Sequence, residues 1–400
     1  MRVVIIGNGL AGTMAAKSLR ELDPSVEIEI FAEERHPYYP RPNLIEFIAG
    51  NLAHEKLFAF PEHWEERQNI AIHAGEPVVR IDAGRGKVEI RGGRTSAFDR
   101  LLLANGSSAF VPSIKGAEKK GVFVLRTLDD ALAILEYLKD HPRVAVLSGG
   151  LLGLEIARAL KARGASVVVN EFFDRLLPRQ LDTGGAGILK AQIEKLGIEV
   201  CLGVETEEIT GADEAAGLKF KGGGGAETDM VIVAAGVKPN ITMAKEAGIV
   251  VDRGIVVNDL LETSRPGIFA AGDVAQHRGR VYGIIPASFD QARVAAFNML
   301  SQEKIYRGTV PSNQLKVAGV FVTSVGQVNP EGEGFEVRVR EAPETGIYKK
   351  IVIKNGILTG AIWMGTRKGA AEITRLAASG QNIDKWTNTL LEDNFDFSSL

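Results

Sequence analysis

Three glycines near the start of the chain, Gly7, Gly9 and Gly12, have the spacing G-x-G-x-x-G. A glycine inside a helix or strand costs about 0.5–1 kcal/mol relative to alanine, so this concentration of glycines needs a physical reason. In a turn from strand to helix, the first glycine permits a tight turn and the second lets a pyrophosphate approach the main chain. The third lets the helix pack closely on the strand. The spacing therefore predicts a site for pyrophosphate, held by free N–H groups at a helix start.

The elements expected around these glycines fit that chemistry. The apolar, β-branched run 3–6 predicts a buried parallel strand, and apolar residues at helical spacing predict a helix over 11–22. The strand predicted over 27–32 ends at Glu33 and Glu34, about where a ribose-binding carboxylate belongs. A chance glycine-rich turn is the alternative. The carboxylates favour a dinucleotide site, and they leave the kind of dinucleotide open.

A second segment further along the chain repeats this design. An apolar strand leads into Gly149, Gly150 and Gly153, and a helix is predicted over 155–163. Ser148 replaces the first glycine of the pattern; it fits a tight turn but narrows the allowed dihedral angles. Gly150 and Gly153 keep the spacing for close approach and close packing.

The strand that follows, predicted over 166–170, again ends at a carboxylate, Glu171. Two such units point to an enzyme that holds two dinucleotides, and the usual pair is a bound flavin, FAD, with a nicotinamide dinucleotide. We expect Glu171 to accept hydrogen bonds from ribose hydroxyls and to repel a 2′-phosphate. That favours NADH over NADPH, with the nearby Arg175 arguing the other way.

Composition excludes several classes of protein. Of 400 residues, 45% are hydrophobic and 24% charged, which is ordinary for a globular protein. The formal net charge of -3 argues against a protein that binds nucleic acid through bulk electrostatics. We expect no membrane-spanning segment and no signal peptide, so the expected location is cytoplasmic.

Cysteine and histidine usage bears on redox and metal chemistry. The chain has one cysteine, Cys201, which excludes a disulfide framework, a C-x-x-C pair and a cysteine-ligated cluster within one chain. Its apolar surroundings predict a buried small hydrophobe rather than a catalytic thiol. The six histidines show no clustering at metal-ligand spacing, so no metal site is expected.

Four further segments extend the pattern over nearly the whole chain, and with them the chain resembles the pyridine nucleotide-disulfide oxidoreductase superfamily. They are the strand ending in Ala104-Asn105-Gly106, the crossover 230–240 with Gly236, the segment 263–273 ending in Gly272-Asp273, and the helix 287–300. The resemblance implies that Asp273 accepts a hydrogen bond from a flavin ribityl hydroxyl.

The order of these motifs predicts an α/β architecture with two Rossmann-like dinucleotide-binding domains. The FAD domain is expected over 1–113 and 239–311, split by an NAD(P)H domain over 114–238. Residues 312–400 resemble the family's small C-terminal α+β interface domain, with strands expected over 319–328, 335–341, 347–354 and 357–363 and a helix over 367–378.

The branch of the family is indicated by segment 36–50. Relatives that pass electrons to a protein thiol carry a cysteine here, and this chain has none. The pattern Tyr-x-Arg-Pro-x-Leu is similar to NAD(P)H:rubredoxin oxidoreductases and to the FAD/NAD portion of assimilatory nitrite reductase large subunits. In related ferredoxin reductases a lysine often stands where this chain has Glu46.

The resemblance also assigns roles to single residues. Arg41 becomes a candidate contact for FAD phosphate or ribityl oxygens, with a surface arginine beside prolines as the alternative. Glu155 becomes the candidate catalytic acid near nicotinamide and flavin, with a helix first-turn acid as the alternative. Motifs and resemblance together give these candidate cofactor-binding residues: Gly7, Gly9, Leu10, Ala11, Gly12, Glu33, Glu34, Arg41, Val79, Ala104, Asn105, Gly106, Gly149, Gly150, Leu152, Gly153, Glu171, Gly236, Gly272 and Asp273.

The resemblance implies a flavoprotein oxidoreductase that passes hydride from NADH to FAD and electrons onward to a separate small redox carrier such as rubredoxin. Two alternatives stay open: an NADH oxidase or diaphorase that uses oxygen or quinones, and a flavin-based redox-sensing protein. The chain could act as a homo-oligomer.

Overall fold

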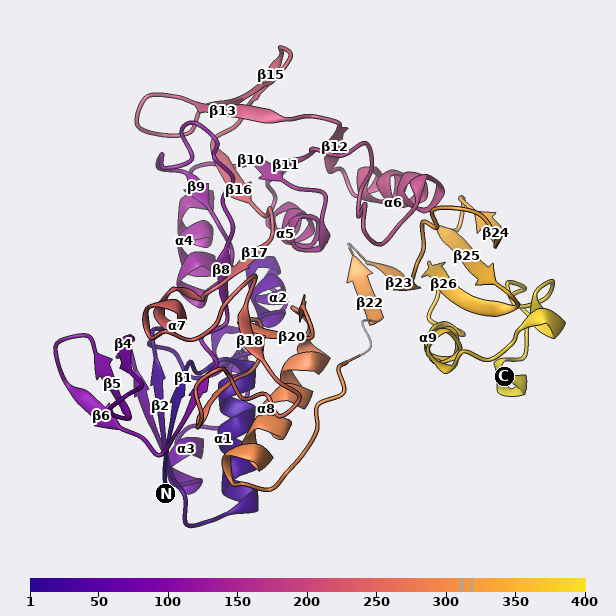
Figure 1. Cartoon of the computed structure of the whole chain (residues 1–400). Coiled ribbons are helices and arrows are strands. Elements are labelled where there is room, and N and C mark those ends of the chain that lie inside the picture. Colours follow the sequence, from indigo (N-terminus) through magenta and orange to yellow (C-terminus); the bar gives the residue numbers. More distant parts are fainter. Residues whose placement is uncertain (310–311, 318) are drawn as a thin grey trace.

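The computed structural model describes residues 1–309, 312–317 and 319–400, and Figure 1 shows their arrangement. Among them lie two five-stranded parallel sheets and one five-stranded antiparallel sheet, each with helices packed against it, and several smaller sheets. The α/β class expected from the sequence is confirmed.

The first parallel sheet has the strand order β19-β7-β1-β2-β3. Its strands are β1 (Arg2–Ile6), β2 (Glu27–Ala32), β3 (Ile70–Ala74), β7 (Arg100–Leu103) and β19 (Ile268–Ala270). The central strand β1 pairs in parallel with β2 on one side and β7 on the other, and helices cover the sheet. Its apolar side chains are therefore buried. Helices α1 (Leu10–Leu22) and α8 (Ile285–Met299) lie side by side against it (Figure 1).

The second parallel sheet has the order β12-β11-β10-β16-β9. Its strands are β9 (Val122–Phe123), β10 (Arg143–Leu147), β11 (Ser166–Glu171), β12 (Glu199–Leu202) and β16 (Met230–Val233). Helices α4 (Leu128–Leu138), α5 (Leu151–Ala162) and α6 (Thr183–Lys195) belong to the same part of the chain. Helix α5 begins at Leu151 rather than at the expected residue 155, because Gly150 is its N-cap.

Two crossing segments join these parts. Strand β8 (Ser107–Ala109) leaves the first sheet and pairs antiparallel with β17 (Val237–Pro239), which returns to it. A pair of reciprocal hydrogen bonds sits beside this pairing: Asn105 Nδ2 donates to the Asn240 carbonyl at 2.9 Å, and Asn240 Nδ2 donates to the Asn105 carbonyl at 2.8 Å. This crossing is consistent with an inserted second domain.

The C-terminal sheet has the order β22-β23-β26-β25-β24, with all pairs antiparallel. Its strands are β22 (Ser312–Val317), β23 (Val320–Gly326), β24 (Phe335–Ala342), β25 (Ile347–Lys354) and β26 (Ile357–Met364), and helix α9 (Ala370–Ser379) packs on it (Figure 1). Four expected strands are present; β22 was not among the strands the sequence predicted, and α9 begins three residues later than expected.

The smaller elements complete the chain. Two small sheets are antiparallel: one has β4 (Val78–Asp82), β5 (Lys87–Ile90) and β6 (Thr95–Ala97), and the other has β13 (Thr206–Thr210), β14 (Gly217–Phe220) and β15 (Gly225–Glu227). A third is mixed: β20 (Ala275–His277) pairs antiparallel with β21 (Arg280–Val281) and parallel with β18 (Ile255–Val257). The remaining helices are α2 (Asn43–Ala49), α3 (Trp64–Arg67) and α7 (Thr242–Glu246).

One apolar core continues through three parts of the molecule. It includes Leu44 and Ile48 of α2, Leu154 of α5, and Tyr348 and Met364 of the C-terminal sheet. Burial of this shared apolar surface contributes to holding the two parallel sheets and the C-terminal sheet in one arrangement.

Cys201 corrects one expectation. It lies in β12 as predicted, but its side chain is half-buried rather than buried, and its thiol lies 3.7 Å from Glu199 Oε1. Burial, followed by the nearby Glu199 carboxylate, raises the pKa of the Cys201 thiol. A raised pKa disfavours the thiolate, so the expectation that Cys201 is not a catalytic thiol stands.

Candidate functional site

The predicted cofactor residues of the first sheet meet at one edge of it. Residues 7–9 follow β1, 33–34 follow β2, 104–106 follow β7 and 271–273 follow β19. Because these strands are parallel, their carboxyl ends share one edge of the sheet. In open α/β sheets this edge is where ligands bind.

The glycines of the first turn have separate physical roles there. Gly7 has φ +108°, and a Cβ on it would lie 2.4 Å from the Ala104 carbonyl oxygen. A Cβ on Gly12 would lie 1.9 Å from the Gly7 carbonyl oxygen, so α1 can approach β1 only with glycine there. A Cβ on Gly9 would meet nothing within 4 Å, so Gly9 borders open space. This geometry fits the tight turn expected at Gly7 and the close packing expected at Gly12, while the approach of a pyrophosphate to Gly9 stays a prediction.

The amino end of α1 is built to receive an anion. Its N-cap is Gly9, no side chain caps it, and its first turn, from Leu10, carries no acidic residue. Helix α4 contrasts with it, since Thr127 caps that helix and its first turn is acidic. The first N–H groups of α1 therefore have no side-chain acceptor, and a helix N-terminus in this state binds phosphate well.

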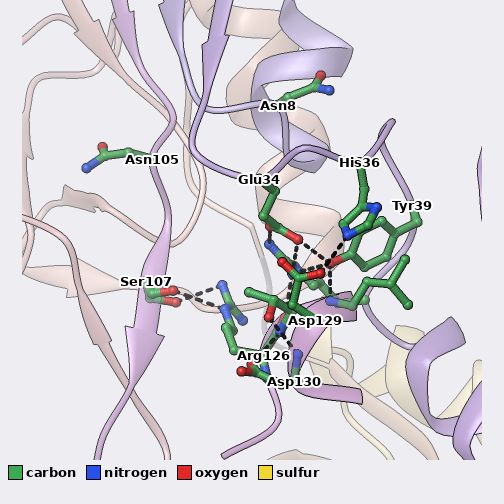
Figure 2. Close-up of polar contacts among 12 residues, drawn as sticks. Asn8, Glu34, His36, Tyr39, Asn105, Ser107, Arg126, Asp129 and Asp130 are labelled. Atoms are coloured by element: carbon green, nitrogen blue, oxygen red, sulfur yellow. Dashed lines mark hydrogen bonds and ion pairs between the residues drawn. The ribbon is translucent and has the colours of Figure 1, made fainter. Parts of the chain in front are cut away.

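We call the glycine turn 7–12, with the start of α1, the first cradle. Two buried amide atoms of residues in or near it also have no partner. Among the residues that the structure describes, Asn8 Nδ2 and Asn105 Oδ1 are buried and make no hydrogen bond. Figure 2 labels both side chains, which stand apart from the cluster of polar contacts around Tyr39 and Arg126. A buried polar atom without a partner is costly, so these two atoms are candidates for contact with a polar ligand at this edge.

The carboxylates after β2 differ in their surroundings. Glu33 is exposed, whereas Glu34 accepts hydrogen bonds from both Tyr39 and Arg41. Arg41 also donates to the carbonyl oxygen of Arg126, and the Leu128 N–H donates to the Tyr39 hydroxyl at 2.8 Å (Figure 2). Arg41 is thus fixed in a network rather than free at the surface, and its network ties β2 to the start of α4.

Asp273 has a partner that the sequence reasoning missed. Arg126 Nη2 lies 2.9 Å from Asp273 Oδ2, and the Ser107 hydroxyl donates to the same oxygen at 2.9 Å. Arg126 Nε also donates to the Ser107 carbonyl at 3.0 Å (Figure 2). Both contacts with Asp273 use Oδ2, so Oδ1 has no hydrogen-bond donor among the residues that the structure describes. No short-range pattern marks Arg126, because it acts on an aspartate far away in the sequence.

Of the other predicted residues, Gly272 and Gly106 lie at the same edge, whereas Val79 lies in β4 of a separate sheet. A Cβ on Gly272 would lie 2.9 Å from Ala11 Cβ, which shows how closely 271–273 approach the start of α1. The Gly272 N–H donates to Gln291 Oε1 of α8 at 2.8 Å. Gly106 accepts from the Asn240 N–H at 3.0 Å. Val79 is exposed at a register shift in β4, so the ladder is interrupted where it stands.

The second cradle lies at the matching edge of the second sheet. Residues 148–150 follow β10, and Gly236 lies beyond the end of β16. A Cβ on Gly153 would lie 2.0 Å from the Ser148 carbonyl oxygen, which repeats the relation between Gly12 and Gly7. Gly150 caps α5 without a side-chain hydrogen bond, and the first turn of α5 carries no acidic residue. Ser148 adopts φ +145°, the left-handed side on which glycine is favoured, so this serine carries backbone strain.

Glu171 holds the loop of this cradle together. Its two oxygens accept hydrogen bonds from the Gly149 N–H and, at 2.9 Å, from the Phe173 N–H. Its side chain is only 4% exposed. Next to it, both amide atoms of Asn170 are buried without a partner in the described part of the chain. Leu152, by contrast, is exposed at the start of α5.

Glu155 lies in the second turn of α5. Arg158 Nη2 donates to Glu155 Oε2 at 3.2 Å and to Glu46 Oε1 of α2 at 2.6 Å. The candidate acid therefore shares one guanidinium nitrogen with a carboxylate from the first part of the chain. The sequence did not indicate this contact.

Both cradles fit dinucleotides. Each presents a glycine turn, a helix start without a side-chain cap and a carboxylate at or after the end of the next strand, and each has buried amide atoms without a partner among the described residues. Within the described residues, no group of three or more histidine, cysteine, aspartate or glutamate side chains could hold a metal ion. The helices described include none with the length and apolar character that crossing a bilayer requires.

Comparison with known proteins agrees with this site. Residues 1–296 match the family described as pyridine nucleotide-disulphide oxidoreductase, and residues 311–381 match the rubredoxin NAD+ reductase C-terminal domain. A nitrite reductase [NAD(P)H] of Bacillus subtilis (strain 168) is 39% identical over 366 residues, which are 91% of this chain and 45% of that protein. The chain thus spans about half the length of that relative.

Two further similarities cover nearly all of both chains compared. An NADH-rubredoxin oxidoreductase of Clostridium acetobutylicum is 30% identical over 392 residues, covering 97% of this chain and 99% of that protein. The crystal structure of NADH:rubredoxin oxidoreductase from the same species superposes with a TM-score of 0.82 at 28% identity, covering 96% of each chain.

Proposed function

Because the chain belongs to the pyridine nucleotide-disulphide oxidoreductase family, we propose that it transfers reducing equivalents from NADH through FAD to a separate one-electron carrier protein such as rubredoxin. The observation that carries this proposal is the pair of uncapped glycine cradles at the carboxyl edges of two parallel sheets. Membership of the family implies FAD and NAD(P)H; the choice of NADH and the identity of the carrier are our proposals.

FAD is assigned to the first cradle. The N–H groups at the start of α1 would hold its pyrophosphate, and the carboxylates after β2 would bind its ribose. Asp273, oriented by Arg126 and Ser107, would accept a hydrogen bond from the ribityl chain. When bound, FAD supplies the redox chemistry, since it accepts a hydride from NADH and can release the two electrons singly.

NADH is assigned to the second cradle. The start of α5 would hold the pyrophosphate, while Glu171 disfavours a 2′-phosphate near the adenosine ribose by charge repulsion. Glu155, one helical turn beyond Leu151 and Leu152, is our candidate for orienting the nicotinamide. The protein's contribution is placement of the two rings and exclusion of side reactions.

A carrier protein is favoured as acceptor by two observations. Segment 36–50 has no cysteine, so a thiol there cannot take electrons from the flavin. In addition, similarity to an NADH-rubredoxin oxidoreductase extends over nearly the full length of both chains. Carrier encounters of this kind bury little area and rely on electrostatic steering.

An anaerobic stopped-flow experiment tests the proposal. The purified protein, loaded with FAD, is mixed first with NADH and then with oxidised rubredoxin. Fast bleaching of the flavin band followed by fast bleaching of rubredoxin is the expected result. Fast flavin bleaching with slow rubredoxin reduction would reject rubredoxin and favour oxygen or a quinone as acceptor. Absence of a flavin band after addition of FAD would reject the assignment of the first cradle.

A further inference from the structure

Three charged groups meet where α2 packs against α5. Arg158 Nη2 lies 2.6 Å from Glu46 Oε1 of α2 and 3.2 Å from Glu155 Oε2 of α5. The side chains of Arg158 and Glu155 are each 22% exposed and that of Glu46 is 45% exposed, so the contact between Arg158 and Glu155 is the more shielded from water. We call Glu46, Arg158 and Glu155 the interhelix triad.

The geometry of the triad constrains its charge. Both carboxylates bond the same nitrogen, so their oxygens lie within about 6 Å of each other. Two carboxylates at that separation repel each other, and a cation between them offsets the repulsion. Burial disfavours the charge of Arg158, but Glu155 and Glu46 outweigh that cost and raise the pKa of Arg158. Arg158 therefore places a positive charge between the two carboxylates.

The triad also lies at the boundary between the proposed cofactor sites. Glu155 follows the second glycine cradle on α5, and α2 follows the segment whose Arg41 joins the first cradle. The helices α2 and α5 share one apolar core, which fixes their spacing. A charge at this point therefore acts on the cofactor rings that meet between the two cradles in the proposed function.

We propose that Arg158 is a positioning residue for hydride transfer: it holds Glu155 in one orientation, and it keeps the charge beside the flavin from becoming more negative. This proposal rests on the proposed function, because it requires FAD and NADH in the two cradles. Arg158 touches neither cofactor in this proposal and acts through Glu155.

Replacing Arg158 tests the proposal through two readouts. In Arg158→Met, we expect the rate of flavin bleaching at saturating NADH to fall by about 10-fold or more, as expected for loss of a charge-assisted hydrogen bond. We also expect the flavin midpoint potential to fall, because the lost positive charge stabilised the reduced, more negative form. The potential is measured by dye-coupled reduction without NADH, at about pH 8.5, far above the ordinary pKa of a glutamate carboxyl.

Two further variants separate the effect of the positive charge from the effect of the arginine side chain itself. Arg158→Lys keeps the charge and should recover part of both readouts. In the double variant Arg158→Met/Glu46→Lys, the new ammonium group arises from α2 within reach of Glu155, because Glu46 and Glu155 share one donor. We expect it to recover rate and potential more fully than Arg158→Met alone.

Arg163→Met is the matched structural control. Arg163 follows the last residue of α5 and, like Arg158, contacts α2: its Nε donates to the Ile48 carbonyl at 2.7 Å, and within the described residues it bonds no carboxylate. Its loss should loosen the same helix contact while leaving the flavin potential unchanged. If Arg163→Met and Arg158→Met shift the potential equally, or if Arg158→Met leaves both readouts at wild-type values, the positioning role is rejected.

Failure of the proposed function is recognised separately. If wild-type protein binds FAD but NADH does not bleach it, the proposed function is rejected, and an unchanged dye-coupled potential in Arg158→Met would independently reject the charge effect. If NADH bleaches the flavin of the wild-type protein and Arg158→Met gives the same bleaching rate and flavin potential as wild type, the inference about Arg158 is rejected while the proposed function stands.

Discussion

Arg126, at the start of the second part of the chain, donates to the carboxylate of Asp273, which follows a strand of the first sheet. Both side chains are about one quarter exposed, and Ser107 on the crossing segment completes the contact. The proposed FAD site is therefore finished by a residue from outside the first sheet. This relationship makes FAD binding dependent on how the two parts of the chain pack.

Replacement of Arg126 should weaken FAD binding. In Arg126→Met, Asp273 loses its cation and is no longer held in one orientation, so we expect FAD affinity to fall about 10- to 100-fold, the range for one charge-assisted hydrogen bond. Titration of apoprotein with FAD by flavin fluorescence measures this. Arg143→Met is the control, since Arg143 pairs with Asp229 at the start of β10, at the end of the strand away from the glycine turn. Equal FAD affinity in both variants would contradict the role of Arg126.

Two alanine substitutions should separate folding from cofactor binding. Gly9→Ala introduces a Cβ that meets nothing within 4 Å, at φ -83°, which alanine adopts easily. We expect the apoprotein to melt near the wild-type temperature while FAD affinity falls by about 10-fold or more, because the methyl group occupies the place of the pyrophosphate. Calorimetry of the apoprotein and FAD titration measure the two effects.

Gly12→Ala is the contrasting variant. Its Cβ would lie 1.9 Å from the Gly7 carbonyl oxygen, so α1 must move away from β1. We expect a loss of about 3 kcal/mol of stability in the apoprotein itself, in the range of overpacking in a close-packed core. A Gly12→Ala apoprotein as stable as wild type would show that the third glycine is not needed for packing.

The sequence predicted what depends on neighbours in the chain. Gly7, Gly9 and Gly12 take their roles from one turn between a strand and a helix, so spacing alone identifies them. Arg126 and Arg158 act on Asp273 and Glu46, which are far away in the sequence, and only the packing of separate elements brings them together. Cys201 was expected to be buried because its strand is apolar, but β12 is an edge strand and its side chains are less covered.

Glu171 shows a further limit of sequence reasoning. Its place after β11 was predicted, yet its bonds to the Gly149 and Phe173 N–H groups follow only from the folded loop. In Glu171→Gln, one amide oxygen must replace two carboxylate oxygens and the negative charge is lost. We expect KM for NADH to rise about 5-fold and the preference for NADH over NADPH to narrow, because a 2′-phosphate is no longer repelled.

Steady-state kinetics with both nucleotides measure this prediction. The Glu199→Gln variant is the control, because Glu199 lies on the neighbouring strand β12 away from the cradle. A variant Glu171→Gln with an unchanged ratio of kcat/KM for the two nucleotides would remove Glu171 from coenzyme choice and leave it only the role of fixing the loop.

Asp182 joins α6 to the C-terminal sheet, and we expect this junction to weaken in acid. Its Oδ2 accepts from the Tyr348 hydroxyl and from Lys350 Nζ, both at 2.7 Å, while Oδ1 caps α6 through the Gly185 N–H. Burial acts to raise the pKa of the Asp182 carboxyl, but these donors, Lys350 foremost, outweigh burial and hold the pKa below its ordinary value of 3.8. The stabilisation is therefore complete above about pH 4 and is lost as the pH falls through the lowered pKa of the folded state.

Lys350→Met should expose this junction at neutral pH. Lys350 is largely buried, so its removal leaves Asp182 without its cation, and we expect a loss of about 3 kcal/mol. Hydrogen exchange in α6 and β25 measures this loss of stability locally, and we expect protection there to fall about 100-fold in the variant. In the wild-type protein, we expect protection of the same elements to fall when the pH drops below about 4. Lys354→Met, an exposed change on the same strand, should leave protection unchanged. If α6 and β25 keep their protection in Lys350→Met, the apolar core rather than the ion pair holds the C-terminal sheet in place.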